Sequence, residues 1–291
     1  MSTTKDAPNL HLDFVEIVEP RLFISSSYNT AYLTSTPAAK IDVSNPGSGW
    51  FDCGTIRSVR VPISKEVFEH QAGVPKTSRK QWEISRSAQI SFNTKDLTPY
   101  VEALIMGSSI FNVTGSLIAS SEHVASLFTD GSRRRKYFKI AKKKNPAFKQ
   151  YDLVVCASNT SASLKDSYNV AVVESMTGSI ITLEGAGFPA DPALGDLVSK
   201  VRTVEFIDNL GSDVVRSALL FWDTLVSGGT SKLQHVLYFP KLRNYSGGDY
   251  DMKDAAEPYD IGVTLSAQAV SMTFGDGSTG YNFFKKWVLN Y

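Results

Sequence analysis

The sequence predicts a mainly β fold with one flanking helix and a small β domain inserted between its two halves. Long segments, at 55–61, 82–92 and 258–273, alternate apolar with polar residues. This period is typical of strands with one buried face. One segment, Leu97–Met106, has a convincing helical pattern. Short β-like runs follow one another closely between the two halves, which favours a separate small β domain.

Composition fits an ordinary folded protein. The chain has 291 residues, of which 42% are hydrophobic and 20% charged, enough to bury a core. The formal net charge is +1, so overall charge predicts no partner. Cys53 and Cys156 lack the spacing of a zinc site, and we expect two reduced thiols. We find no signal peptide or long apolar span, and we expect assembly in the cytoplasm without a membrane partner.

The first half is interpreted in order along the chain. Residues 1–49 are polar and rich in proline, and are predicted to be an N-terminal arm, extended or with short strands, ahead of the main fold. Residues 50–130 begin the core, with a strand at 55–61. A polar loop is predicted from Pro62 to Lys80, followed by a strand at Trp82–Phe92.

The helix has recognisable end signals. Asp96 can cap the segment Leu97–Met106, Thr98-Pro99 offers a second start, and Gly107 stops it. The apolar stretch that follows, to residue 128, fits a strand and a short helix equally well.

Residues 131–208 are predicted to be the inserted domain, a small β-barrel. Its expected strands are 136–141, 151–157, 169–175, 179–184 and 201–207. Residues 209–291 complete the core. Residues 214–226 fit a helix or a strand by period, and the glycines after them favour a hairpin with Gln234–Phe239.

No motif predicts catalysis, a metal or a cofactor. The segment Gly275–Gly280 matches a dinucleotide fingerprint in letters only, because no helix or acidic residue follows, and we interpret it as a hairpin loop. Asp249, Asp251 and Asp254 lack the glycine and glutamate of a calcium loop. No common catalytic signature is present, and we predict that the chain is not an enzyme.

Segment 133–149 is the strongest compositional anomaly. It has no acidic residue, and aromatic residues interleave its charges, as on many nucleic-acid surfaces. The alternatives are a solvated strand and loop, or a patch that pairs with acidic protein surface. The acidic remainder of the insert favours these alternatives. The basic patch comprises Arg133, Arg134, Arg135, Lys136, Lys139, Lys142, Lys143, Lys144 and Lys149.

The segments that flank the insert resemble the tail tube (major tail) proteins of tailed bacteriophages. The resemblance lies in Asp52-Cys53-Gly54, the loop to Lys80, the following strand and the helix. It continues in the order of segments 216–221, 238–243 and 259–267. It covers roughly 160 residues in two blocks and excludes the insert and the arm.

The resemblance implies a β-sandwich core of two sheets with a flanking helix. It also implies homohexameric rings that stack into a tube in the virion, through which DNA passes without specific binding. Other tail proteins, such as sheath, baseplate and terminator, would be partners. The alternative is a nucleic-acid-binding β module that uses the basic patch.

Two regions are expected to lie at subunit contacts. Strands 82–92 and 258–273 are expected beside neighbouring subunits. The predicted loop from Pro62 to Lys80 is expected to mediate contact because loops of this length in compact domains are usually functional. Its charged members are Lys65, Glu66, Glu69, Lys76, Arg79 and Lys80.

Overall fold

A computed structural model describes most of the chain. The described residues are 16–37, 41–43, 46–47, 49–72, 77–94, 99–106, 109–113, 122–127, 135–141, 148–207, 214–225, 232–246 and 261–290.

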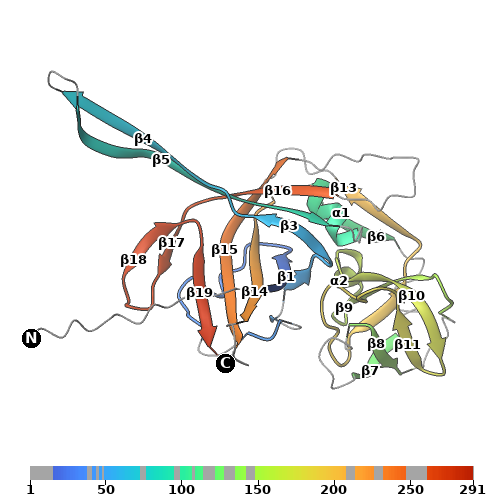
Figure 1. Cartoon of the computed structure of the whole chain (residues 1–291). Coiled ribbons are helices and arrows are strands. Elements are labelled where there is room, and N and C mark those ends of the chain that lie inside the picture. Colours follow the sequence, from blue (N-terminus) through green and yellow to red (C-terminus); the bar gives the residue numbers. More distant parts are fainter. Residues whose placement is uncertain are drawn as a thin grey trace, which may run out of the picture.

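A nine-stranded antiparallel sheet curved into a half-barrel forms the core (Figure 1). Its main path runs β2-β1-β14-β15-β16-β5-β3, while β19 pairs with β15 and β4 pairs with β5. The strands are β1 (Glu16–Ser25), β2 (Trp50–Asp52), β3 (Ile56–Arg60), β4 (Ile63–Ala72), β5 (Thr77–Thr94), β14 (Arg216–Leu225), β15 (Lys232–Ser246), β16 (Ile261–Ala267) and β19 (Lys285–Asn290).

The core sheet buries apolar residues on both faces. On β14, Leu220 packs with the helix α1 (Pro99–Met106), whereas Leu219 and Phe221 point to the other side. We call these sides the helix face and the loop face. The loop face of β1, β14 and β15 is covered by the segment that carries Tyr32 and Ile41. Because both faces of β14 are covered, its sequence is a continuous apolar run, which explains why period alone could not distinguish helix from strand.

A closed six-stranded barrel forms the second body, in the order β10-β11-β8-β7-β12-β9 (Figure 1). Its interior is filled by apolar side chains such as Phe138, Val173 and Phe188. The strands are β7 (Glu122–Leu127), β8 (Tyr137–Ile140), β9 (Leu153–Ala157), β10 (Val170–Thr177), β11 (Ile180–Leu183) and β12 (Leu197–Lys200).

Short elements complete the described fold. The strands β6 (Ser109–Val113) and β13 (Thr203–Ile207) pair as a two-stranded ribbon. In the sequence, β6 precedes the barrel strands and β13 follows them. A second ribbon joins β17 (Val270–Thr273) to β18 (Thr279–Asn282). The helix α2 (Ser161–Lys165), which the sequence analysis missed, is capped by the Thr160 hydroxyl, which accepts a hydrogen bond of 3.1 Å from the Ser163 amide.

The mainly β class with a small barrel is confirmed. The helix is also confirmed, and it begins at Pro99, the second of the two starts that the sequence offered. The core strands, however, belong to one curved sheet and not to two. The predicted position of the N-terminal segment ahead of the main fold is wrong for β1, which lies inside that sheet with Leu22 and Ile24 fully buried. Tertiary pairing with β14 overrides the proline-rich composition around β1.

The barrel boundaries also differ from the predicted insert. The barrel includes β7 and therefore begins before residue 131, while the expected strand 201–207 is β13, outside the barrel. The core hairpin of β14 and β15 is confirmed. Within the segment 258–273, which was expected beside a neighbouring subunit, β16 is paired on both sides, with β15 and β5, and its described residues have no free edge.

Candidate functional site

A two-stranded arm projects from the core sheet where a loop was predicted (Figure 1). We define the arm as β4 and residues 77–87 of β5. β4 pairs along its whole length with β5, from Ile63 opposite Ala88 to Ala72 opposite Thr77. The predicted loop from Pro62 to Lys80 is therefore wrong. The segment mixes charged and apolar residues because both faces of the ribbon lie in solvent. It therefore lacks the alternation of apolar and polar residues that a strand with one buried face shows.

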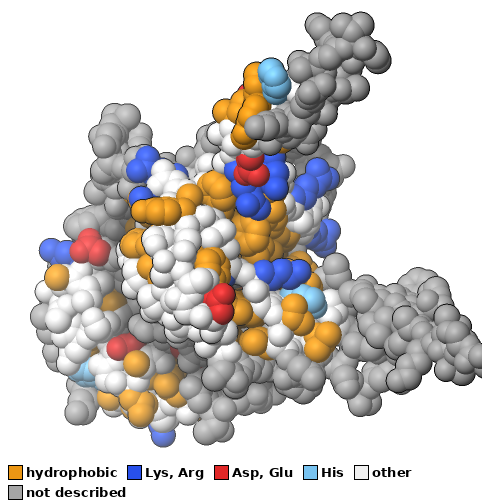
Figure 2. Space-filling model, turned by 90° about the vertical axis from the view of Figure 1, so that its left-hand side faces the viewer, with side chains coloured by type: hydrophobic (Ala, Val, Ile, Leu, Met, Phe, Trp, Pro, Cys, Tyr) orange, Lys and Arg blue, Asp and Glu red, His pale blue; other side chains and the backbone are white. Residues whose placement is uncertain are grey.

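Aromatic side chains gather on the exposed arm. The rings of Phe68 and Trp82 stack with centroids 5.9 Å apart, and the His70 ring lies 6.4 Å from that of Trp82. Phe68 is 52% exposed and Trp82 48% exposed. Figure 2 shows hydrophobic side chains along the arm. Three more apolar arm residues are exposed, namely Ile63, Val67 and Ile84.

Two of the predicted contact residues of the arm have partners on the arm itself. Lys65 forms an ion pair of 3.5 Å with Glu83, and Glu66 accepts a hydrogen bond of 3.0 Å from the Ser85 hydroxyl. Both interactions cross between β4 and β5, so they stiffen the arm.

The side chains of Lys76, Arg79 and Lys80 lie outside the part of the chain that the structure describes. Only the backbone is described at Arg79 and Lys80 on β5, and Lys76 lies outside the described residues. Glu69 lies exposed on β4.

Arg135 was predicted to be part of a basic patch, but it is buried at the junction between the barrel and the core sheet. Only 5% of the residue is exposed. Its guanidinium binds Asp52 of β2 and Asp191 of the barrel, each at 3.0 Å, and lies 5.3 Å from the centre of the Phe23 ring. Charge-assisted contacts of this kind fix orientation, because a guanidinium presents its donors in a rigid plane. Arg135 therefore belongs to the interior.

The other described members of the basic patch have different surroundings. Lys136 pairs with Glu174 at 3.1 Å, Lys139 lies exposed on β8, and Lys149 lies exposed ahead of β9. Outside the described residues lie Arg133, Arg134, Lys142, Lys143 and Lys144.

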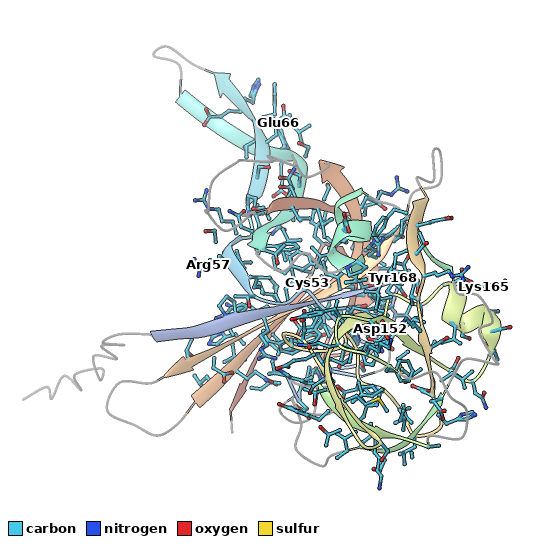
Figure 3. The ribbon with its side chains drawn as sticks, turned by 90° about the vertical axis from the view of Figure 1, so that its right-hand side faces the viewer. Cys53, Arg57, Glu66, Asp152, Lys165 and Tyr168 are labelled. Carbon is cyan, nitrogen blue, oxygen red and sulfur yellow. The ribbon has the colours of Figure 1, made fainter. Side chains whose placement is uncertain are left out.

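Aromatic rings form a second junction contact between the barrel and the core sheet. Tyr168 of the barrel packs edge-on against Tyr100 of α1 and Phe51 of β2, with ring centroids 5.4 and 5.8 Å apart. The Arg216 guanidinium of β14 lies 5.7 Å from the centre of the Tyr168 ring. Figure 3 labels Tyr168 where the barrel meets the core. With Arg135, this contact fixes the barrel against the sheet.

A cavity of about 350 Å³ lies at the same junction. Asp52 and Arg135 line it together with the barrel segment 184–189. Gly187 is required here because a Cβ atom at its position would lie 2.2 Å from the Arg135 carbonyl oxygen. Asp52 and Arg135 pair with each other in the wall, which makes the cavity part of the junction.

The strand β3 carries a feature that the sequence analysis missed. Its register with β5 slips between Arg57 and Arg60, and Ser58 has a φ of +51°. This is a β-bulge with a non-glycine residue in the left-handed region. The signal was present, because the core-packed residues Ile56 and Val59 are three positions apart and a regular strand would place them on opposite faces.

The groups considered for catalysis or metal binding have structural surroundings. Residues 275–278 lie in the hairpin loop between β17 and β18, as predicted, while Thr279 and Gly280 begin β18. Both cysteines are buried free thiols, and burial raises their pKa values. Among the described residues, no group of three or more potential metal ligands from His, Cys, Asp and Glu is found. Asp249, Asp251 and Asp254 lie outside those residues.

Comparison with known proteins identifies no relative. No protein-family model matches the chain, and no curated protein matches it. Among the described residues, no helix is both long enough and apolar enough to cross a membrane.

Proposed function

We propose that the chain is a structural protein of a bacteriophage tail, which assembles into stacked hexameric rings that form the tail tube. The observation that carries the proposal is the arm, a two-stranded ribbon with exposed aromatic rings on a body whose other parts are well packed. The partner is a second copy of the chain. DNA passes through the lumen, and other tail proteins contact the ends and outside of the tube.

The arm gains little stability from its own chain. An isolated two-stranded ribbon is marginal in water, and exposed strand edges promote pairing with other chains. Among the described residues, β4 pairs only with β5, and β5 pairs only with β4 before Ala88. Contact with a second subunit buries Phe68 and Trp82 and orders the ribbon. Burial of one such side chain contributes about 1.5–3 kcal/mol.

The basic patch offers less support for a nucleic-acid-binding module. Arg135 is buried and paired with two carboxylates, so it is not free to bind phosphate. Lys136 is likewise paired, with Glu174.

The test combines negative-stain microscopy with light scattering on the purified full-length protein. The parent is expected to form rings or tubes. The double variant Phe68→Ser with Trp82→Ser is expected to remain folded and to lose assembly. The matched control is Tyr151→Ser, because Tyr151 is 71% exposed on the barrel, far from the arm.

Two results would overturn the proposal. One is a parent that stays strictly monomeric at high concentration. The other is an arm variant that forms tubes as the parent does, which would give the arm another role.

A further inference from the structure

A polar surface covers part of the loop face of the core sheet. On β5 and β16, buried residues of the helix face alternate with half-buried residues of the loop face. Cross-strand register places Ser91 opposite Thr264 and Gln89 opposite Ser266. Cross-strand partners point to the same side of a sheet. We call this surface the polar sheet face, which comprises Arg57, Arg60, Gln89, Ser91, Asn93, Thr264 and Ser266.

The bulge in β3 brings both arginines to the polar sheet face. Arg57 lies opposite Asn93 and Arg60 opposite Ser91, although residues three apart in a regular strand point to opposite faces. Ser58 adopts its left-handed conformation inside the slip. Bulges commonly redirect side chains, and backbone strain gathers at functional positions. The local distortion thus places both arginines on the same face of the sheet.

These arginines have no ion-pair partner among the described residues. Both are exposed, and Figure 3 shows Arg57 at the outer side of the sheet, away from Tyr168 and the barrel. Along the described parts of β3, β5 and β16, no acidic side chain lies on this face before the arm. The first one reached along the arm is Glu66, opposite Ser85. Arg135, by contrast, forms ion pairs with two carboxylates.

We infer that the polar sheet face binds the phosphate backbone of duplex nucleic acid without reading its sequence. Arginine, serine, threonine, asparagine and glutamine are the side chains that supply most phosphate contacts. No aromatic side chain lies on this face along β3, β16 or residues 88–94 of β5, which disfavours stacking on single-stranded bases. The neutral hydroxyl and amide groups on β5 and β16, beside the arginines, can donate hydrogen bonds to phosphate oxygens.

The inference goes beyond the proposed tube, because it applies to a single subunit whether or not rings form. Binding by so few cations is expected to be weak and steeply dependent on salt, because each neutralised phosphate releases condensed counterions. Such contacts hold a duplex without fixing its register.

The test measures fluorescence anisotropy of a short labelled DNA duplex with the full-length protein across a salt series. The variant Arg57→Gln with Arg60→Gln is expected to bind more weakly at low salt. Its log–log salt slope is expected to fall by about 2, or about 0.9 for each lost phosphate contact. The matched control, Lys139→Gln with Lys149→Gln, removes two exposed charges of the basic patch and is expected to bind as the parent does.

A conservative pair separates charge from fold. Arg57→Lys with Arg60→Lys keeps the charges and is expected to restore most of the salt slope, while circular dichroism confirms that each variant is folded. Three outcomes would overturn the inference: no duplex binding by the parent at low salt, equal losses in the control, or a glutamine variant that loses only self-association. The last result would assign this face to a second copy of the chain. Loss of assembly in the arm variant with unchanged DNA binding would leave this inference standing.

Discussion

The junction and the arm use similar side chains in opposite ways. At the junction, Arg135 is buried against carboxylates of the same chain, and the partly buried Tyr168 packs against rings of the same chain. On the arm, Phe68 and Trp82 stack on each other but remain about half exposed. The junction contacts are completed within one chain, whereas in the proposed function the arm contacts are completed by a second copy. Stability is therefore expected to depend on the junction and association on the arm.

The largest expected effect on stability is at Arg135. Arg135→Met removes the guanidinium that pairs with the buried Asp52 and with the mostly buried Asp191, and leaves Asp52 only the more distant Arg21, at 3.7 Å, which is expected to lower the free energy of unfolding by about 3–5 kcal/mol. Urea unfolding measures the loss. The control Lys139→Met, on the exposed side of β8, is expected to stay within about 0.5 kcal/mol of the parent. A loss of the same small size at Arg135 would contradict a buried junction.

A smaller effect is expected at Tyr100. Its buried hydroxyl donates a hydrogen bond of 2.7 Å to the Ile24 carbonyl, and Tyr100→Phe leaves that acceptor unsatisfied. We expect a loss of about 1–3 kcal/mol in urea unfolding. Tyr281→Phe is the matched control, since Tyr281 is 79% exposed on β18. Equal behaviour of the two variants would mean that this contact adds nothing.

The Asp52 carboxyl is expected to give a distinctive pH dependence. Burial raises its pKa, although the guanidinium groups of Arg135 and Arg21 oppose the shift. The folded protein therefore holds this proton more tightly than the unfolded chain. The contribution of Asp52 to the free energy of unfolding rises as the pH falls through the raised pKa, and is complete below the ordinary value of about 3.9.

The measurement compares the parent with Asp52→Asn by urea unfolding between neutral and mildly acidic pH. The parent is expected to gain stability relative to the variant on acidification. Asp276→Asn should show the opposite trend, because the Ser278 hydroxyl and amide lower the pKa of Asp276. A difference between parent and Asp52→Asn that does not change with pH would contradict the raised pKa.

The smallest effect on stability is expected on the arm. Phe68→Ser with Trp82→Ser removes two half-exposed rings and is expected to change the free energy of unfolding of the subunit by no more than about 0.5 kcal/mol per site. Urea unfolding at low protein concentration checks this. A loss as large as that of Arg135→Met would show that the arm is part of the subunit's own core.

Local patterns account for much of the fold. Alternation along Trp82–Phe92 predicted a strand, and residues 82–92 lie within β5. The proline at the predicted second helix start coincides with the first residue of α1. The glycines after residue 226 favoured a hairpin, and β14 and β15 pair as expected. These features depend on neighbouring residues in the chain, so the sequence carries their signal directly.

Tertiary structure decided what local patterns could not. Arg135 belongs to a basic run whose composition favours solvent exposure. Only its ion pairs with Asp52 and Asp191 show that it lies in the interior. β1 contains Pro20, and proline favoured an extended arm, yet pairing with β14 places β1 in the core sheet. In β3, spacing hinted at the bulge, but the register with β5 was needed to place Arg57 and Arg60 on one face. The physical reason is common to all three: burial and pairing depend on residues far away in the sequence, and their free energies exceed local preferences.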